Sequence, residues 1–268
     1  MQYKMKQFAV IGSPISHSLS PNLHEEIFRQ LNVNASYSRV DILPENLGNF
    51  FLNNELDGFN VTIPHKISIM KHLSNLDTTA EKISAVNCVH NNIGYNTDWI
   101  GFLHAMNLNN VKLENKDCLI IGAGGAAYAT AYALIHCKAR SISITNRSED
   151  SRTNLMNWIN NQFDNKNGFN PNVIINCTPL GMWPNLNAIP TDQYINESDI
   201  AIETIYNPEE TTWLKNCKKG GAQTISGLDM FIGQAIASIE IWFNTSIEKK
   251  INIKMIKNIL KAELCLQE

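Results

Sequence analysis

The 268-residue sequence has no long apolar segment, and no window approaches the roughly 18 consecutive apolar residues that a membrane-spanning helix requires. Its first residues, MQYKMKQ, lead directly into FAVIG without the apolar core of a secretory signal peptide. Charge of one sign is not in excess either, because 22 Lys and Arg stand against 25 Asp and Glu, for a net charge of -3. We therefore expect a cytoplasmic protein that binds neither membranes nor nucleic acid.

Clustered cysteine is missing as well. The six cysteines are widely scattered and form no C-x-x-C pair. Neither a zinc site nor a disulfide framework is indicated, so we predict no metal site. The composition, 44% apolar and 18% charged, is that of ordinary globular proteins, and the length allows one large or two medium domains.

Short apolar segments alternate with helical ones along the chain. Ser20 and Pro21 read as the N-cap and first position of a helix, whose apolar face consists of Leu23, Ile27 and Leu31. The hydrophobic periodicity predicts strands at 8–13, 36–42 and 59–63 and helices at 45–54, 66–73 and 99–108. This alternation predicts an α/β fold with a mainly parallel sheet covered by helices, followed by a second unit.

The segment NVTIPHK, residues 60–66, ends an apolar strand with a hydroxyl, an imidazole and an amine. Apolar and polar residues alternate before it, and Pro64 stops the strand because proline cannot continue a hydrogen-bonded ladder. Lys66 therefore follows the carboxyl end of a strand, where α/β proteins place their ligands. It is a candidate acid or base; the alternative is a solvated lysine that opens the next helix.

The sequence CLIIGAGGAA, residues 118–127, places an apolar strand directly before a glycine-rich turn and a helix. Gly122, Gly124 and Ala127 fit the dinucleotide fingerprint G-x-G-x-x-G/A. Glycines permit the tight turn and a close approach of the backbone, and amides at the start of the helix face the pyrophosphate. This part of the chain is predicted to be a Rossmann-like nucleotide-binding unit.

The strand predicted at 141–145 ends at Asn146 and Arg147. In this fold an acidic residue at that place grips the adenosine ribose of NAD. An amide and an arginine instead favour a 2′-phosphate, and hence NADP; the alternative is a surface arginine. Glu149 and Asp150 follow closely, and their charge would repel a phosphate unless they are turned away.

Two further predicted strands, at 172–179 and 201–206, end in polar residues beside proline, and we expect both ends to face the nucleotide crevice. The segment 226–234 has a glycine at position 227 and enters a helix that carries Gln234, whose amide needs a partner in a ligand or in the protein. The asparagine-rich stretch at 160–170 is interpreted as an exposed irregular connection.

Several of these segments together resemble the shikimate dehydrogenase family, NADP-dependent enzymes that reduce 3-dehydroshikimate to shikimate in aromatic amino-acid (chorismate) biosynthesis. The resemblance covers nearly the whole chain in the family's order. It is carried by SHSLSP at 16–21, NVTIPHK at 60–66, AVNC at 85–88, YNTD at 95–98, GAGGA at 122–126, NRS at 146–148, YNP at 206–208 and GLDMFIGQ at 227–234.

The resemblance implies a two-domain fold. Residues 1–101 with 235–268 would form a mainly parallel α/β substrate-binding domain, and residues 102–234 a Rossmann-like NADP-binding domain. It implies Lys66 and Asp98 as the catalytic pair. The implied substrate contacts are Ser16, Ser18, Thr62, Lys66, Asn87, Asp98, Tyr206 and Gln234, and the implied NADP contacts are Gly122, Ala123, Gly124, Gly125, Ala126, Asn146, Arg147, Ser148, Thr178, Thr204 and Gly227.

The chemistry of that pair follows from the reaction. Hydride addition to a carbonyl carbon builds negative charge on oxygen, which the ammonium of Lys66 can stabilise and protonate. In an alternative, Lys66 mainly polarises and Asp98 mainly orients, with water completing the proton transfer. Two other functions stay open: a quinate/shikimate dehydrogenase with relaxed cofactor choice, and a catalytically silent ligand-binding relative. The expected partner is a small-molecule substrate, and the expected assembly is a monomer or homodimer.

Overall fold

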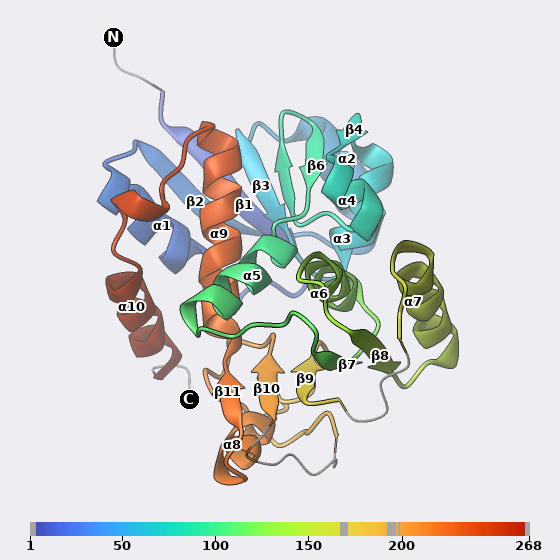
Figure 1. Cartoon of the computed structure of the whole chain (residues 1–268). Coiled ribbons are helices and arrows are strands. Elements are labelled where there is room, and N and C mark those ends of the chain that lie inside the picture. The colour runs from blue at the N-terminus through green and yellow to red at the C-terminus, as the bar shows by residue number, and fades with distance from the viewer. Residues whose placement is uncertain (1–3, 167–170, 192–196, 198, 266–268) are drawn as a thin grey trace. The chain divides into compact units, whose positions relative to one another are not determined.

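The computed structural model describes residues 4–166, 171–191, 197 and 199–265. These residues form two compact units (Figure 1). The first unit contains the residues up to Thr97 together with Gln234–Glu263, and the second contains Asp98–Gly233, to which Leu264 and Cys265 are also assigned. The first unit is therefore built from two separate pieces of the chain.

The first unit holds a six-stranded sheet in the order β2-β1-β3-β5-β6-β4. Its strands are β1 (Lys6–Gly12), β2 (Ala35–Asp41), β3 (Gly58–Val61), β4 (Asn75–Leu76), β5 (Cys88–His90) and β6 (Ile93–Tyr95). The pairs β1–β2, β1–β3 and β4–β6 are parallel, whereas β3–β5 and β5–β6 are antiparallel. The sheet is thus mainly parallel, as the sequence predicted, with an antiparallel segment where β5 and β6 follow one another.

Helices cover both faces of this sheet. In chain order they are α1 (Ser20–Leu31), η1 (Pro44–Asn46), α2 (Leu47–Asn53), α3 (His65–Ser68), η2 (Ile69–His72), α4 (Thr78–Ile83), the end of α9 (Gly227–Phe243), η3 (Glu248–Lys250) and α10 (Ile253–Cys265). The helix predicted at 45–54 corresponds to η1 and α2, and the one at 66–73 to α3 and η2. The structure begins α1 at Ser20 itself, so the N-cap is Leu19 and not Ser20.

Alternation along the strands explains the two faces. Ile11, Phe59 and Val61 pack into a core that the segment from α2 to α4 covers. Neighbouring positions along each strand point to opposite faces of the sheet. On the other face, Phe8 of β1 stacks on Trp242 of α9 with ring centroids 4.5 Å apart. In Figure 1, α9 lies against this face of the sheet.

The second unit holds a five-stranded, entirely parallel sheet in the order β11-β10-β9-β7-β8. The strands are β7 (Asp117–Ile121), β8 (Ser141–Thr145), β9 (Val173–Asn176), β10 (Ile200–Glu203) and β11 (Gln223–Ile225), and the helices are α5 (Asp98–Leu108), α6 (Gly125–His136), α7 (Glu149–Gln162), α8 (Thr212–Lys219) and the start of α9. This is the predicted Rossmann-like arrangement.

Apolar residues cover both faces of the parallel sheet. Ile120 and Ile175 pack with α6 on one face, whereas Ile121 and Ile174 pack with α8 on the other. Strands buried on both faces read as continuous apolar runs, which is how β7 and β9 read in the sequence. The connection predicted at 160–170 was partly wrong, because Asn160–Gln162 complete the last turn of α7; residues 167–170 of that prediction lie outside the described part of the chain.

None of the helices in the described residues is both long and apolar enough to cross a membrane.

Candidate functional site

The end of β3 carries the first group of predicted site residues. The amide of Thr62 donates to the carbonyl of Ile11 at 2.9 Å, and the amide of His65 donates to the carbonyl of Thr62 at 2.8 Å. These bonds turn the chain into α3 directly after the strand. Thr62 and Lys66 are half-buried there, and the carbonyl of Lys66 accepts from the amide of Val86 at 2.8 Å.

His65 has a structural role in this turn. Its side chain is fully buried, and Nε2 lies 2.6 Å from the carbonyl oxygen of Ile42, so this nitrogen carries the hydrogen. The bond joins the segment after β2 to the segment after β3. A histidine held in this way contributes packing and a hydrogen bond, whereas the side chain of Lys66 is half-buried.

Ser16 and Ser18 lie on the loop that follows the carboxyl end of β1. Ser16 is exposed, and the Oγ of Ser18 accepts from the amide of Ser20 at 3.2 Å, which satisfies one amide at the start of α1. Arg39 of β2 donates from Nε to the carbonyl oxygen of Ser18 at 2.7 Å. Sequence reasoning missed Arg39, whose long-range bond fixes the loop on which the predicted carboxylate contacts lie.

Asn87 is buried and held through both ends of its amide. The amide of Thr97 donates to Oδ1 of Asn87 at 2.6 Å, and Nδ2 of Asn87 donates to Oγ1 of Thr97 at 2.9 Å. A flipped amide would place its nitrogen against the N–H of Thr97, so the orientation is fixed by the network. Thr97 is also fully buried and is a positioning residue that the sequence did not reveal.

The network continues to α9. Ser238 accepts from Nδ2 of Asn60 at 2.9 Å, lies 3.1 Å from Oγ1 of Thr97, and donates to the carbonyl of Gln234 at 2.9 Å. The hydroxyl of Tyr37 donates to Oδ1 of Asn60 at 2.8 Å. These buried contacts tie the strand of NVTIPHK, the segment of Asn87 and the helix of Gln234 together within the first unit.

Three other predicted substrate residues are placed as follows. Asp98 is the first residue of α5 and is 7% exposed; at a helix N-terminus the macrodipole favours its negative charge. Gln234 is half-buried on α9. Tyr206, after β10, stacks on Phe231 with centroids 4.0 Å apart. Lys66 belongs to the first unit and Asp98 to the second, so the catalytic pairing of the two stays a prediction.

In the second unit, the glycine turn follows β7. Gly122 has a φ of +113°, and a Cβ atom there would lie 2.9 Å from the carbonyl oxygen of Cys177, so only glycine fits. Gly124 is different, because a Cβ atom on it would meet no protein atom within 4 Å. Gly124 is the N-cap of α6, and Gly125 and Ala126 open that helix.

The open space beside Gly124 fits a phosphate group. The amides of the first helical turn have no partner in the preceding turn and point out of the helix, and the dipole adds partial positive charge there. Ala123 and Gly124 form the bend that exposes them. The two glycines thus differ: Gly122 permits the turn, and Gly124 leaves open space at the helix N-terminus, where the sequence predicts the pyrophosphate of a dinucleotide.

The loop after β8 contains Asn146, Arg147 and Ser148. Nδ2 of Asn146 donates to the carbonyl of Ser148 at 2.9 Å, and Ser148 is the N-cap of α7, with Oγ accepting from the amide of Ser151. Arg147 is exposed at this end of the sheet. The loop therefore presents a cation next to a helix N-terminus, which suits a phosphate.

The negative charge of Glu149, which would repel a phosphate, is paired with Arg152. Arg152 donates to it with both Nε, at 2.8 Å, and Nη2. The hydrogen bond from Arg152 lowers the pKa of the Glu149 carboxyl below its usual value. The pair neutralises Glu149 locally, and it occupies Arg152, so Arg147 is the better candidate for a 2′-phosphate.

Thr178 and Thr204 lie at the carboxyl ends of β9 and β10 and are joined through Asn176. Oγ1 of Thr178 donates to Oδ1 of Asn176 at 2.7 Å, and Oγ1 of Thr204 donates to the carbonyl of Asn176 at 2.8 Å. Gly227 follows closely: a Cβ atom on it would lie 2.4 Å from the carbonyl oxygen of Ile205. The structure thus brings these three predicted NADP contacts to one edge of the sheet.

Beneath this edge lies Glu203, a carboxyl group with 1% exposure. It accepts from Nδ2 of Asn176 and Oγ1 of Thr211, both at 3.0 Å, and from the amides of Thr204 and Ile205. Burial raises its pKa to about 7, although these four donors work in the opposite direction. Glu203 is another residue that sequence reasoning missed.

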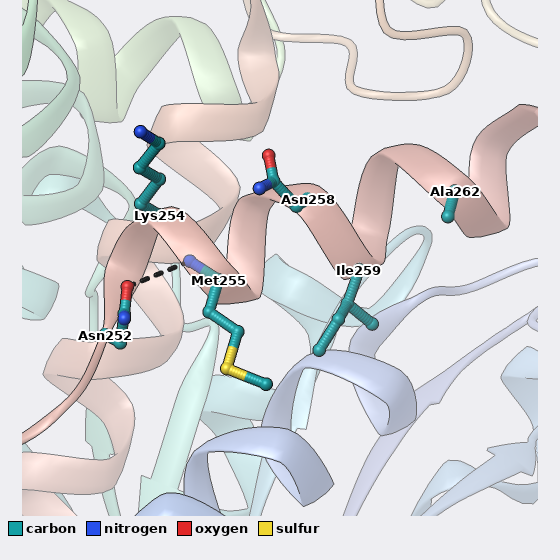
Figure 2. A pocket seen from close by; sticks show the side chains of 6 residues that line it. All are labelled: Asn252, Lys254, Met255, Asn258, Ile259 and Ala262. Atoms are coloured by element: carbon teal, nitrogen blue, oxygen red, sulfur yellow. Dashed lines mark hydrogen bonds between the residues drawn. The ribbon is translucent and has the colours of Figure 1, made fainter.

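No group of three or more His, Cys, Asp or Glu in the described part of the chain is arranged to hold a metal ion. A surface hollow runs along α10 (Figure 2) and is lined by Asn252, Lys254, Met255, Asn258, Ile259 and Ala262. It contains none of the predicted site residues, and its only side-chain contact drawn in Figure 2 is the bond from the amide of Met255 to Asn252.

Both parts of the chain match known families. Residues 10–89 match a family described as the shikimate dehydrogenase substrate binding domain, and residues 110–222 match one described as putative NAD(P)-binding. The shikimate dehydrogenase (NADP+) of Nitrosopumilus maritimus is 38% identical over 254 residues, which cover 88% of this chain and 93% of that protein.

Solved structures agree with the sequence relatives. A shikimate dehydrogenase in complex with NADP+ has a TM-score of 0.89 and 36% identity, covering 97% of this chain and 96% of that one. The enzyme of Thermus thermophilus, in complex with NADP(H) and shikimate, has a TM-score of 0.85 and 26% identity, covering 96% of this chain and 99% of that one. With this similarity across both units, the chain belongs to the shikimate dehydrogenase family.

Proposed function

We propose that this chain is an NADP-dependent oxidoreductase that interconverts shikimate and 3-dehydroshikimate, a step of aromatic amino-acid biosynthesis. The observation that carries the proposal is the similarity of the whole chain to shikimate dehydrogenases, one solved with NADP+ and another with NADP(H) and shikimate. The two units support it, because the first offers hydroxyl, amide and amine groups and the second offers a glycine-rich turn of the kind that binds nucleotides.

We propose the first unit as the substrate-binding domain and the second as the NADP-binding domain, with the boundaries near residues 101 and 234 that the sequence suggested. Ser16 and Ser18 donate hydrogen bonds to the substrate carboxylate. Ring hydroxyls are bound by Thr62, Asn87, Asp98 and Gln234, with Tyr206 beside them. The fixed amide of Asn87 supports this assignment, since a preorganised group loses little entropy when a ligand binds.

Lys66 moves the proton. During reduction its ammonium stabilises the negative charge that develops on the substrate C3 oxygen and then donates a proton to that oxygen. During oxidation the neutral amine accepts the proton from the C3 hydroxyl. Asp98, at the start of α5, orients the reacting hydroxyl. NADPH, when bound, supplies the hydride.

The second unit holds the nucleotide through backbone and a few side chains. Ala123, Gly124, Gly125 and Ala126 bind the pyrophosphate. Asn146, Arg147 and Ser148 bind the 2′-phosphate and so select NADP over NAD. Thr178, Thr204 and Gly227 contact the rest of the cofactor, and Gly122 shapes the turn.

We also propose that the protein works in the cytoplasm as a monomer or homodimer, on small molecules and without nucleic acid or membrane. The balanced charge of 22 basic and 25 acidic residues supports the absence of a polyanionic partner.

The test is a spectrophotometric assay of the purified chain with shikimate and NADP+. The expected result is NADPH absorbance that depends on shikimate, with a specificity constant at least about tenfold higher for NADP+ than for NAD+, because one charge-assisted phosphate contact is worth roughly that much. No shikimate-dependent NADPH formation at high enzyme concentration, with NADP+ binding intact, would contradict the proposal and favour a silent ligand-binding relative.

Quinate serves as the matched substrate control. Equal specificity constants for quinate and shikimate, with either cofactor, would replace the proposal with a quinate/shikimate dehydrogenase of relaxed cofactor choice. The phosphate-binding loop of Asn146, Arg147 and Ser148 is the observation that favours the narrower activity.

A further inference from the structure

Two threonine hydroxyls at the carboxyl edge of the second sheet donate inward. Oγ1 of Thr178 donates to Oδ1 of Asn176, and Oγ1 of Thr204 donates to the backbone carbonyl of Asn176. Neither acceptor carries a hydrogen, and each hydroxyl has only one to give. The Oγ1 of Thr178 also accepts from the amide of Leu180 at 3.2 Å, which leaves it one lone pair. The two half-buried hydroxyls therefore present oxygen lone pairs, and no hydrogen, to whatever binds at this edge.

The side-chain amide of Asn176 determines the hydrogen direction of Thr178, and the orientation of this amide is fixed, whereas Thr204 donates to the backbone carbonyl of Asn176. Nδ2 donates to Oε2 of Glu203 at 3.0 Å and to the carbonyl of Leu180 at 3.2 Å, while Oδ1 accepts from the amide of Thr178 at 2.9 Å as well as from its hydroxyl. All four hydrogen-bonding positions of the side chain are used, and the residue has no exposed surface. A flipped amide would set hydrogens against the N–H of Thr178.

Glu203 holds the nitrogen end of that amide. As a carboxylate it is an acceptor only, so its Oε2 selects Nδ2 of Asn176 and the hydroxyl of Thr211. Its Oε1 accepts from the amides of Thr204 and Ile205 at the end of β10. One buried side chain thus connects the ends of β9 and β10. Through Asn176 it sets the hydrogen direction of Thr178, and through the backbone amide of Thr204 it holds the end of β10.

The place of this edge in the sheet indicates which half of the nucleotide lies over it. In the sheet order β10-β9-β7-β8, the glycine turn follows β7 and the loop of Arg147 follows β8. A Cβ atom on Gly122 would lie 3.1 Å from Cγ2 of Thr178, so Thr178 adjoins the turn on the side away from β8. A dinucleotide that places its 2′-phosphate at β8 and its pyrophosphate at β7 extends its other half over β9 and β10.

We propose that Glu203 and Asn176 are positioning residues that make Thr178 and Thr204 hydrogen-bond acceptors, so that this edge receives a donor group of the nicotinamide riboside half of NADP. The donor is a carboxamide N–H or a ribose hydroxyl. The inference rests on the proposed function, because it requires NADP at the glycine turn.

The experiment compares two ligands by titration calorimetry, at a pH above the pKa of Glu203. NADP+ carries the nicotinamide riboside, whereas adenosine 2′,5′-bisphosphate lacks it. Thr178→Val removes the acceptor and is expected to weaken NADP+ binding about tenfold while changing the bisphosphate by less than about twofold. Thr178→Ser keeps the hydroxyl and is the matched control, with both affinities within about twofold of the unmodified chain.

Glu203→Gln tests the positioning role separately. An amide has one oxygen and one nitrogen, and the nitrogen cannot accept a hydrogen bond. Either Asn176 and Thr211 or the amides of Thr204 and Ile205 therefore lose their acceptor, and the ends of β9 and β10 lose their common anchor. The expected result is the same selective loss of NADP+ affinity, about tenfold, with the bisphosphate unchanged. If Glu203 and Asn176 only support the fold, both ligands would weaken together, and that outcome overturns the proposal.

The 3-acetylpyridine analogue of NADP+ distinguishes the two donors, since a methyl group replaces its carboxamide nitrogen. Equal binding of the analogue to the unmodified chain and to Thr178→Val assigns the donor to the carboxamide; a tenfold loss assigns it to the ribose. Unchanged NADP+ affinity in both Thr178→Val and Glu203→Gln overturns the inference alone. Failure of the unmodified chain to bind either NADP+ or the bisphosphate overturns the proposed function as well.

Discussion

The two units prepare their predicted ligand groups in different ways. In the first unit, Asn60, Asn87, Thr97 and Ser238 are buried side chains that hold one another, and a predicted substrate contact stands among them. In the second, the glycine turn offers backbone amides and open space, and Arg147 brings positive charge from an exposed side chain. Side-chain deletion should therefore damage the first site, whereas added volume should damage the second.

The largest effect is expected from Lys66→Ala, which removes the proposed proton donor of the first unit. Turnover with shikimate and NADP+ should fall by about 10³-fold or more, since general acid catalysis is worth about 10²–10⁴ and charge stabilisation adds to it. NADP+ affinity should stay within about twofold. Steady-state kinetics and calorimetry check both values. Lys71→Ala, at an exposed lysine of η2, is the control and should leave kcat unchanged; a tenfold loss or less in Lys66→Ala would refute the assigned role.

The buried titratable groups of the two units have opposite pH dependences. His24 of α1 is fully buried, stacks on Tyr37, and has its pKa lowered by burial from 6.5 to about 3. A depressed histidine pKa means that the unfolded chain binds the proton first. Stability is therefore lost as pH falls from about 6.5 to about 3, by up to roughly 5 kcal/mol. In His24→Gln, urea unfolding across this pH window should show a smaller decrease of the unfolding free energy as pH falls. An unchanged pH dependence of the unfolding free energy would contradict the burial argument.

Glu203 gives the reverse prediction in the second unit. Its folded pKa of about 7 lies above the ordinary 4.5, so the folded chain binds the proton more tightly. This contribution is present below about pH 4.5 and is lost as pH rises to about 7, by roughly 3 kcal/mol. In Glu203→Gln the free energy of unfolding should lose this decline. A fall of the same size in the variant would mean that another group titrates.

Added volume at the glycine turn should affect binding before folding. Gly124→Ala places a methyl group in the open space reserved for the pyrophosphate and is expected to weaken NADP+ binding by about 10- to 100-fold, since close backbone approach is lost. Its melting temperature should hardly change, because φ is -92° and no protein atom is near. Gly122→Ala is the matched comparison: strain at a φ of +113° should lower the melting temperature itself. Equal melting temperatures in both variants would refute this division of roles.

The smallest effect is expected at the exposed cation. Arg147→Ala should weaken NADP+ about tenfold and leave NAD+ unchanged, because one exposed charge-assisted contact to the 2′-phosphate is lost. Calorimetry with the two cofactors measures the difference directly. Equal losses for both would place Arg147 on a part of the nucleotide that they share.

Much of the fold could be predicted because the second sheet consists of apolar strands with clear ends. The strand at 141–145 agrees with β8 residue for residue, and the turn at Gly122 follows its strand as expected. The short strands β4, β5 and β6 were not predicted, since segments of two or three residues have no period to read, and helix α4, with six residues, spans fewer than two turns. The helices α8 and α10 and strand β11 were not predicted either: α8 and β11 lie between the motifs at 206–208 and 227–234, and α10 follows the last motif.

The positioning residues could not be predicted for a different reason. Asn60 and Ser238 are 178 positions apart, and nothing local in NVTIPHK or in the helix of Gln234 indicates that they meet. Glu203 reads as one acidic residue in a strand until its neighbours Asn176 and Thr211 are known. Motifs locate groups that touch a ligand, whereas the groups that orient them are determined by tertiary contacts.

The two-piece construction of the first unit has a consequence for synthesis on the ribosome. Val89 receives its hydrogen bond from Trp242, 153 residues later, and Phe8 stacks on the same indole. At a translation rate of about 5–20 residues per second, the first sheet waits roughly 8 to 30 s for this helix. Asp98–Gly233 of the second unit lie within that interval of sequence, whereas its residues from Leu264 onward follow it. The nascent chain therefore carries an uncovered aromatic face through the completion of its nucleotide-binding unit, and the part synthesised first is the part that finishes folding last.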